Sequence, residues 1–170
     1  MIEVEKFKTL FFVKSSLITL YLALTIPIPF ISSENLKLLS IITFLLGLFL
    51  IINITSDYVE TSNIKISYKT SFFSKFMGKK NWVVFWKDIN LIKSMPTSQG
   101  SKVFYFITNE NENFLVPQRL ENFEEFLIII SKETGLNVDG LSYISPLWTY
   151  KLLTLISLFM IIGEVFAFSI

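Results

Sequence analysis

The chain of 170 residues contains no cysteine and no histidine. Their absence excludes disulfide bonds, thiolate nucleophiles, imidazole bases, most zinc sites and histidine-ligated haem. Charge is also scarce, because 17% of the residues are charged and the net charge is +1, so the whole chain offers nucleic acid no general attraction. No glycine-rich phosphate loop is present. We therefore expect a protein that is not an enzyme, needs no cofactor or metal, and binds neither nucleic acid nor a small-molecule substrate.

Apolar residues dominate what remains. The chain is 52% hydrophobic with a mean hydropathy of +0.57 and contains 18 phenylalanines. Two uncharged runs of nineteen residues, 15–33 and 38–56, approach the ~20 residues that cross a bilayer. A third apolar stretch, 141–170, contains Lys151 and Glu164. A cleaved signal peptide fits the first run poorly, because the run is long and no small-residue cleavage site follows Phe30. The sequence predicts three transmembrane helices, of which the first two form a hairpin.

Two prolines stand near the end of the first run. Pro27 and Pro29 remove backbone donors and disfavour helix in the residues before them. We expect the first helix to end or kink there. A broken helix that lines a pathway would need polar groups at membrane depth, and only Thr25 supplies one, so we interpret the prolines as the start of a tight connection to the second helix.

Lysines near the predicted spans indicate their orientation. Three lysines precede the first span and three follow the second, whereas Lys37 stands alone between the spans. Because lysines near span ends favour the cytoplasmic side, the N-terminus and the middle of the chain are expected there, with the C-terminus on the opposite side. The six flanking lysines are Lys6, Lys8, Lys14, Lys65, Lys69 and Lys75.

Glu164 is the one acid inside a predicted span. Acids in membrane helices are costly unless paired, and such residues commonly have a function. Glu164 stands six residues before the end of the chain, so it could reach the distal headgroups, pair with Lys37, or contact another helix.

Residues 57–140 show a different pattern. Ile64, Ile66 and Tyr68 alternate with polar residues, which is typical of a half-buried strand. Further strands are predicted at 81–85, 89–95, 102–108 and 113–116, followed by a helix that Asn122 caps and Gly135 ends. The predicted fold class is an α+β membrane protein: a helical hairpin (1–56), an antiparallel sheet domain with one C-terminal helix (57–140), and a third transmembrane helix (141–170).

Several short motifs of the middle segment resemble those of bacterial pleckstrin-homology-like (PH-like) domains. They are Trp86-Lys-Asp-Ile89, the strand Val103-Phe-Tyr-Phe-Ile107, and Phe114-Leu-Val-Pro-Gln-Arg119 leading into Phe123-Glu-Glu-Phe126. Such domains occur in small membrane proteins that place two spans before the domain, and the third span departs from the simplest of these. The resemblance implies a non-catalytic module that serves lipid contact, self-association or partner docking.

Charge is segregated within this segment. Residues 62–102 hold eight lysines against Asp88, a net charge of +7, whereas residues 103–139 have a net charge of −5. Aromatics and lysines are interleaved in one predicted loop, where they could contact anionic lipid or a partner. The alternative is that the phenylalanines belong to the sheet core and the lysines to a solvated rim. The candidate contact residues are Phe72, Phe73, Lys75, Phe76, Lys79 and Lys80.

The sequence as a whole predicts a non-enzymatic binding module of the plasma membrane, or of the thylakoid membrane in a photosynthetic source. The expected role is that of a scaffold or assembly factor for a membrane-protein complex, and the expected partners are the lipid bilayer and other membrane proteins or further copies of the chain. The alternative is a small regulatory subunit of a transport or channel complex, which would use the spans and Glu164.

Overall fold

A computed structural model describes residues 4–169 and divides them into two compact units. The sheet unit contains residues 4–10 together with Ser56–Ser145, and the helical unit contains Phe11–Thr55 and residues 146–169. Residues 4–10 therefore belong to the sheet unit, although the sequence had grouped them with the hairpin. Residue 170, the predicted end of the third span, lies outside the described residues.

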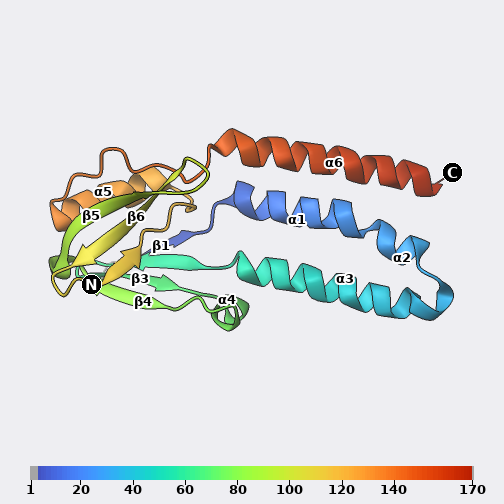
Figure 1. The fold of residues 1–170 in the computed structure, drawn as a ribbon, viewed down its shortest axis with the longest axis horizontal. Helices are drawn as coiled ribbons and strands as arrows, with labels where there is room; N and C mark the ends of the chain where they lie inside the picture. Colours follow the sequence, from blue (N-terminus) through green and yellow to red (C-terminus); the bar gives the residue numbers. More distant parts are fainter. Residues whose placement is uncertain (1–3, 170) are drawn as a thin grey trace. The chain divides into compact units, whose positions relative to one another are not determined.

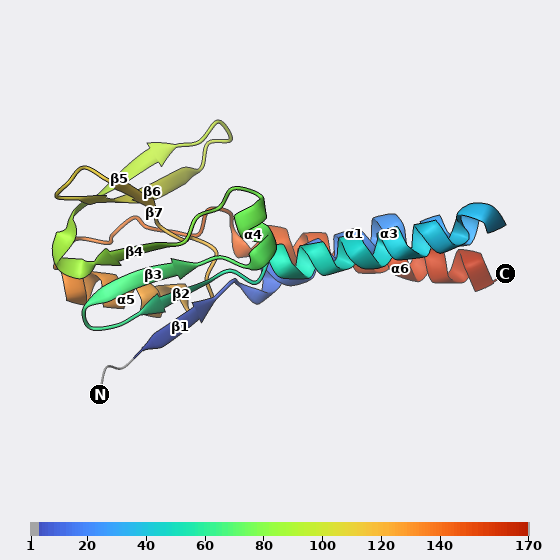
Figure 2. The ribbon, with the colours of Figure 1, turned by 90° about the horizontal axis from the view of Figure 1, so that it is seen from below.

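The sheet unit contains two antiparallel sheets. The first has the order β1 (Glu5–Lys8), β2 (Tyr58–Thr61), β3 (Lys65–Lys69) and β4 (Trp82–Phe85), as Figure 2 shows. A 3₁₀ turn, Trp86–Asp88, leads into the second sheet of β5 (Ile89–Pro96), β6 (Lys102–Thr108) and β7 (Asn113–Leu115). The predicted strands at 81–85, 89–95, 102–108 and 113–116 are confirmed to within a residue at each end.

The core of the sheet unit lies between the strands and α5 (Phe123–Thr134). Phe106 of β6, Val59 of β2 and Ile66 of β3 are fully buried, as are Phe126 and Ile130 of α5. These positions follow the two-residue period of strands and the three-to-four-residue period of a helix. Phe7 of β1 also belongs to this core, with its ring centroid 5.4 Å from that of Phe126.

The helix α5 begins and ends where the sequence predicts, but the Asn122 side chain does not cap its N-terminus. Asn122 occupies the cap position with φ 50°, and its side chain makes no capping hydrogen bond. A capping side chain normally requires extended backbone, so the left-handed conformation removes that geometry. Gly135 closes the helix with φ 69° and donates its N–H to the Ser131 carbonyl, as the prediction required.

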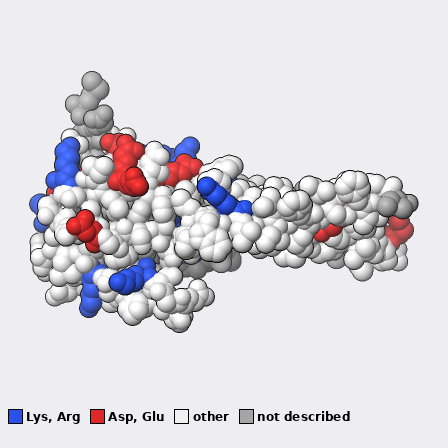
Figure 3. Space-filling model, turned by 90° about the horizontal axis from the view of Figure 1, so that it is seen from above, with Lys and Arg blue, Asp and Glu red and all other residues white. Residues whose placement is uncertain are grey.

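The helical unit contains α1 (Phe11–Thr25), α2 (Pro27–Ile31), α3 (Glu34–Ile54) and α6 (Leu147–Ser169). The break at Ile26 agrees with the predicted kink at the prolines. The prolines do not start the connection to the second helix, because the chain stays helical over Pro27–Ile31 and the connection follows Ile31. Three helical segments, Phe11–Ile31, Glu34–Ile54 and Leu147–Ser169, are long and apolar enough to cross a membrane. Within this unit α1 contacts both α3 and α6, as Figure 1 shows. Figure 3 shows the helical unit almost free of charged side chains on its visible face.

Tyr21 fixes the packing of α1 against α3. Its hydroxyl donates to the Phe44 carbonyl at 2.7 Å, and its ring stacks on that of Phe44. Gly47 lies beneath the same tyrosine, and a Cβ atom added there would overlap the Tyr21 ring. Small residues let membrane helices approach closely, and Gly47 has that role here.

Gly47→Val is expected to destabilise the helical unit by about 1–3 kcal/mol, because the added side chain must displace Tyr21 and break its hydrogen bond. Thermal unfolding of the full chain in detergent micelles, followed by circular dichroism, measures the effect. Gly163→Val in α6 is the matched control, since nothing lies within 4 Å of a Cβ added at Gly163. Equal losses in the two variants would contradict the packing role of Gly47.

Candidate membrane-contact site

The segment between β3 and β4 forms a short helix, α4 (Phe72–Phe76), where the sequence had predicted a loop. Ser71 starts the helix, because its hydroxyl accepts the N–H of Ser74 at 3.2 Å. Gly78, with φ 90°, follows its end in a conformation that favours glycine. We refer to residues 71–81 as the α4 loop.

The α4 loop exposes large apolar side chains. Phe72, Phe76 and Met77 are 75%, 86% and 67% exposed, so Phe72 and Phe76 do not belong to the sheet core. Phe73 is half-buried and contacts Phe72 edge-on. Lys75 and Lys80 are exposed in the same loop. The structure thus brings apolar and basic side chains together, as the interleaved sequence predicts.

Asp57 holds the α4 loop to the rest of the sheet unit. It is buried, and its carboxylate accepts hydrogen bonds from the Ser71 N–H at 2.8 Å, the Tyr68 hydroxyl at 2.9 Å and the Lys79 ammonium at 2.7 Å. Lys79 therefore differs from the other predicted contact residues, because its charge is paired inside its own unit. The sequence had grouped Lys79 with Lys75 and Lys80, and the ion pair separates it from them.

The surroundings of Asp57 alter two acid–base equilibria. Desolvation by burial acts to raise the pKa of Asp57, but the hydrogen bonds from Lys79, Ser71, Ser74 and Tyr68 outweigh it and hold this pKa below its ordinary value. Burial, and then the nearby Asp57 charge and hydrogen bond, raise the pKa of Tyr68 well above its ordinary value. Asp57 is thus ionised and Tyr68 neutral across the physiological range.

Two further contacts fix the base of the α4 loop. The Asn81 side-chain oxygen accepts the Thr70 N–H at 2.8 Å and the Thr70 hydroxyl at 2.7 Å. The Thr9 hydroxyl donates to the Asp57 main-chain carbonyl at 2.8 Å. Together with the Asp57 carboxylate, these bonds hold the two ends of the loop in one geometry.

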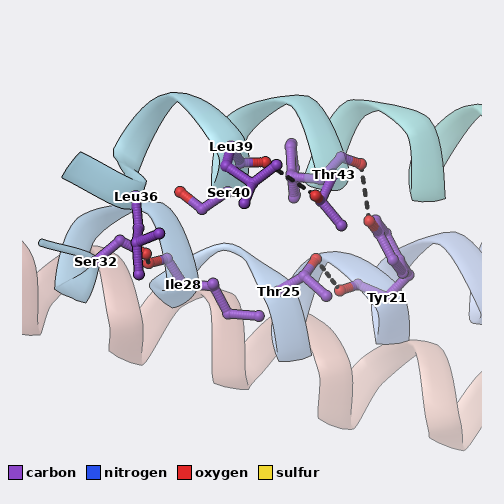
Figure 4. Close-up of a pocket in the computed structure, with 9 residues that line it drawn as sticks. Tyr21, Thr25, Ile28, Ser32, Leu36, Leu39, Ser40 and Thr43 are labelled. Atoms are coloured by element: carbon purple, nitrogen blue, oxygen red, sulfur yellow. Dashed lines mark hydrogen bonds between the residues drawn. The ribbon is translucent and has the colours of Figure 1, made fainter. Parts of the chain in front are cut away.

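A separate cavity of about 300 Å³ lies within the helical unit, between α1, α2 and α3 (Figure 4). Its lining is mostly apolar and includes Tyr21, Thr25, Ser32, Ser40 and Thr43. Each of these hydroxyl groups donates to a main-chain carbonyl of the helices: the acceptors are on Phe44, Tyr21, Ile28, Lys37 and Leu39, respectively. The cavity therefore presents few polar groups that lack a partner.

Glu164 lies in α6 with one carboxylate oxygen buried and without a hydrogen-bond partner. Lys37, one of its predicted partners, instead lies 3.6 Å from Glu34. The Lys151 ammonium contacts the Phe12 ring, and Phe168 stacks on Phe30, so α6 runs parallel to α1 and α2. This register places Glu164 near the level of the break at Ile26.

The chain is 28% identical, over 149 residues, to an uncharacterized protein of Synechocystis sp. (strain PCC 6803). The matched region covers 84% of this chain and 75% of the relative. No protein-family model matches the chain.

Proposed function

We propose that this chain is a membrane-anchored, non-enzymatic binding module that acts as a scaffold or assembly factor for a membrane-protein complex. The observation that carries the proposal is α3, whose 21 residues include none that is buried within the chain. Its apolar side chains must be shielded from water, and in a bilayer the shielding comes from lipid or from the helices of other proteins. A folded sheet unit on the same chain supplies a second surface for partners.

The hydrogen bonding of β1 to β2 supports a defined sidedness. β1 precedes the first candidate span and β2 follows the second, and the two strands pair in antiparallel register from Glu5↔Thr61 to Lys8↔Tyr58. Paired strands must lie on the same side of a membrane. Together with the lysine distribution, this pairing favours a hairpin whose two ends face the cytoplasm.

The antiparallel sheets followed by α5 also support the PH-like character that the sequence motifs suggest. Under this proposal the sheet unit is a docking module and has no catalytic role. The second candidate function, a regulatory subunit of a transport or channel complex, is favoured by one observation, the buried oxygen of Glu164 that lacks a partner.

Affinity purification of the full chain from native membranes in mild detergent tests the scaffold proposal. We expect a complex of defined composition that is weakened at least several-fold by Leu38→Ala combined with Leu45→Ala, because both side chains are exposed on α3. Ile128→Ala, at an exposed position of α5, is the control. Recovery of the chain alone, or of a complex that is insensitive to the α3 variant, would contradict the proposal.

A further inference from the structure

The exposed apolar side chains of the α4 loop are unusual for a water-facing surface. Phe76 and Phe72 are more exposed than any large apolar residue of α3 or α6, the candidate membrane helices. Single exposed apolar residues are common, but three within six residues form a patch that points to an interaction. Lys75 and Lys80 lie in the same loop and are exposed.

The α4 loop is held in this exposed form. Ser71 caps the helix, Asn81 bonds to Thr70 across the base, and Asp57 binds both Ser71 and Lys79. These bonds oppose a rearrangement that would bury Phe72 and Phe76. Because the loop is ordered before it meets a ligand, binding costs little conformational entropy.

Chain connectivity ties the α4 loop to a candidate span. Asp57 follows Ile54, the last residue of α3, by three residues, and three extended residues reach at most about 11 Å. A loop anchored to Asp57 therefore has a bilayer surface available at high effective concentration once α3 is inserted.

From these observations we propose that the α4 loop docks on the surface of an anionic bilayer. Phe72, Phe76 and Met77 enter the interfacial layer, and Lys75 and Lys80 bind the phosphates of anionic lipids. Lys79 does not contribute, because its charge neutralises Asp57. The inference rests on the proposed function only in requiring that the helical unit be inserted in a membrane.

The absence of cysteine allows a direct test, since a single introduced thiol can be labelled without removing others. The full chain carrying Met77→Cys, labelled with the environment-sensitive fluorophore NBD, is reconstituted in lipid nanodiscs of equal phosphatidylcholine and phosphatidylglycerol. Ile128→Cys, which replaces a similarly exposed residue of α5, is the matched control. We expect blue-shifted emission and at least twofold stronger quenching by doxyl-labelled lipid at residue 77 than at residue 128.

A second comparison tests the charge requirement. Lys75→Glu with Lys80→Glu, made in the Met77→Cys chain, should abolish most of the quenching difference, as should nanodiscs of phosphatidylcholine alone. Quenching at residue 77 no stronger than at residue 128 would overturn membrane docking. Quenching at residue 77 that is unaffected by the lysine variants and by the loss of anionic lipid would overturn the role of the lysines.

The same labelled chains separate this inference from the scaffold proposal. NBD at residue 77 that is shielded in the native complex but not in anionic nanodiscs would assign the loop to a protein partner and overturn lipid docking. Lipid-dependent quenching in a chain that purifies without partners would retain lipid docking and contradict the scaffold role.

Discussion

Replacing Asp57 by alanine should destabilise the sheet unit by about 3 kcal/mol, because three hydrogen bonds to a buried carboxylate are lost together. The loss leaves the Tyr68 hydroxyl and the Ser71 N–H without their acceptor, whereas Lys79 can turn to solvent. Urea unfolding of the full chain in detergent micelles, followed by tryptophan fluorescence, measures this change, since Trp82 and Trp86 pack in the core.

The pH dependence of the same unfolding transition tests whether the ionised Asp57 carboxylate stabilises the sheet unit. The folded-state pKa of Asp57 is lowered, so its contribution is complete above the unfolded value of about 3.9 and is lost as the pH falls through the folded value. Asp57→Ala should remove that part of the acid dependence. Asp139→Ala, at an exposed carboxylate of the same unit, is the control and should change stability by less than about 0.5 kcal/mol. An unaltered acid profile in Asp57→Ala would contradict this account.

Phe126→Ala should have the largest effect on the sheet unit, a loss of about 3–5 kcal/mol in the free energy of unfolding. Phe126 is fully buried, and its ring contacts those of Phe7 and Phe123. Truncation opens a cavity between α5 and β1, and the neighbouring rings cannot fill it without leaving their packed positions. The measurement is the same urea titration. The slope of the free energy of unfolding against urea concentration is compared between variant and parent chain to detect a change in the unfolded state.

Ile128→Ala is the matched control for Phe126, because it removes an apolar side chain from the same helix at an exposed position. Its expected effect is within about 0.5 kcal/mol. If the two variants were equally stable, Phe126 would not be a core residue of the protein in solution.

The features that the sequence predicted well are those with strong local signals. Uncharged runs of nineteen residues are long enough to predict membrane-length helices. The seven residues of β6 are rich in β-branched and aromatic side chains, which favour a strand, and Phe104, Phe106 and Thr108 are buried in it. Pro27 acts on the backbone next to it, so the break at Ile26 was also predictable.

The missed features depend on contacts between distant residues. β1 is four residues long with one buried side chain, Phe7, so its alternation is too short to recognise. Its partner β2 follows the hairpin in the sequence, about fifty residues after β1, and no local sequence rule specifies that pairing. The interleaved lysines and aromatics predicted the α4 loop as a contact surface, but Lys79 differs from Lys80 only because the fold places Asp57 beside it.

The pairing of β1 with β2 has a consequence for biosynthesis. β1 leaves the ribosome before the hairpin does, and β2 emerges only after both candidate spans have been made. If only one of the two helices entered the bilayer, the two strands would lie on opposite sides and the first sheet could not close. If the candidate spans cross a membrane, closure of the first sheet therefore requires that both insert or that neither does, and a chain with only one inserted helix would keep β1 unpaired.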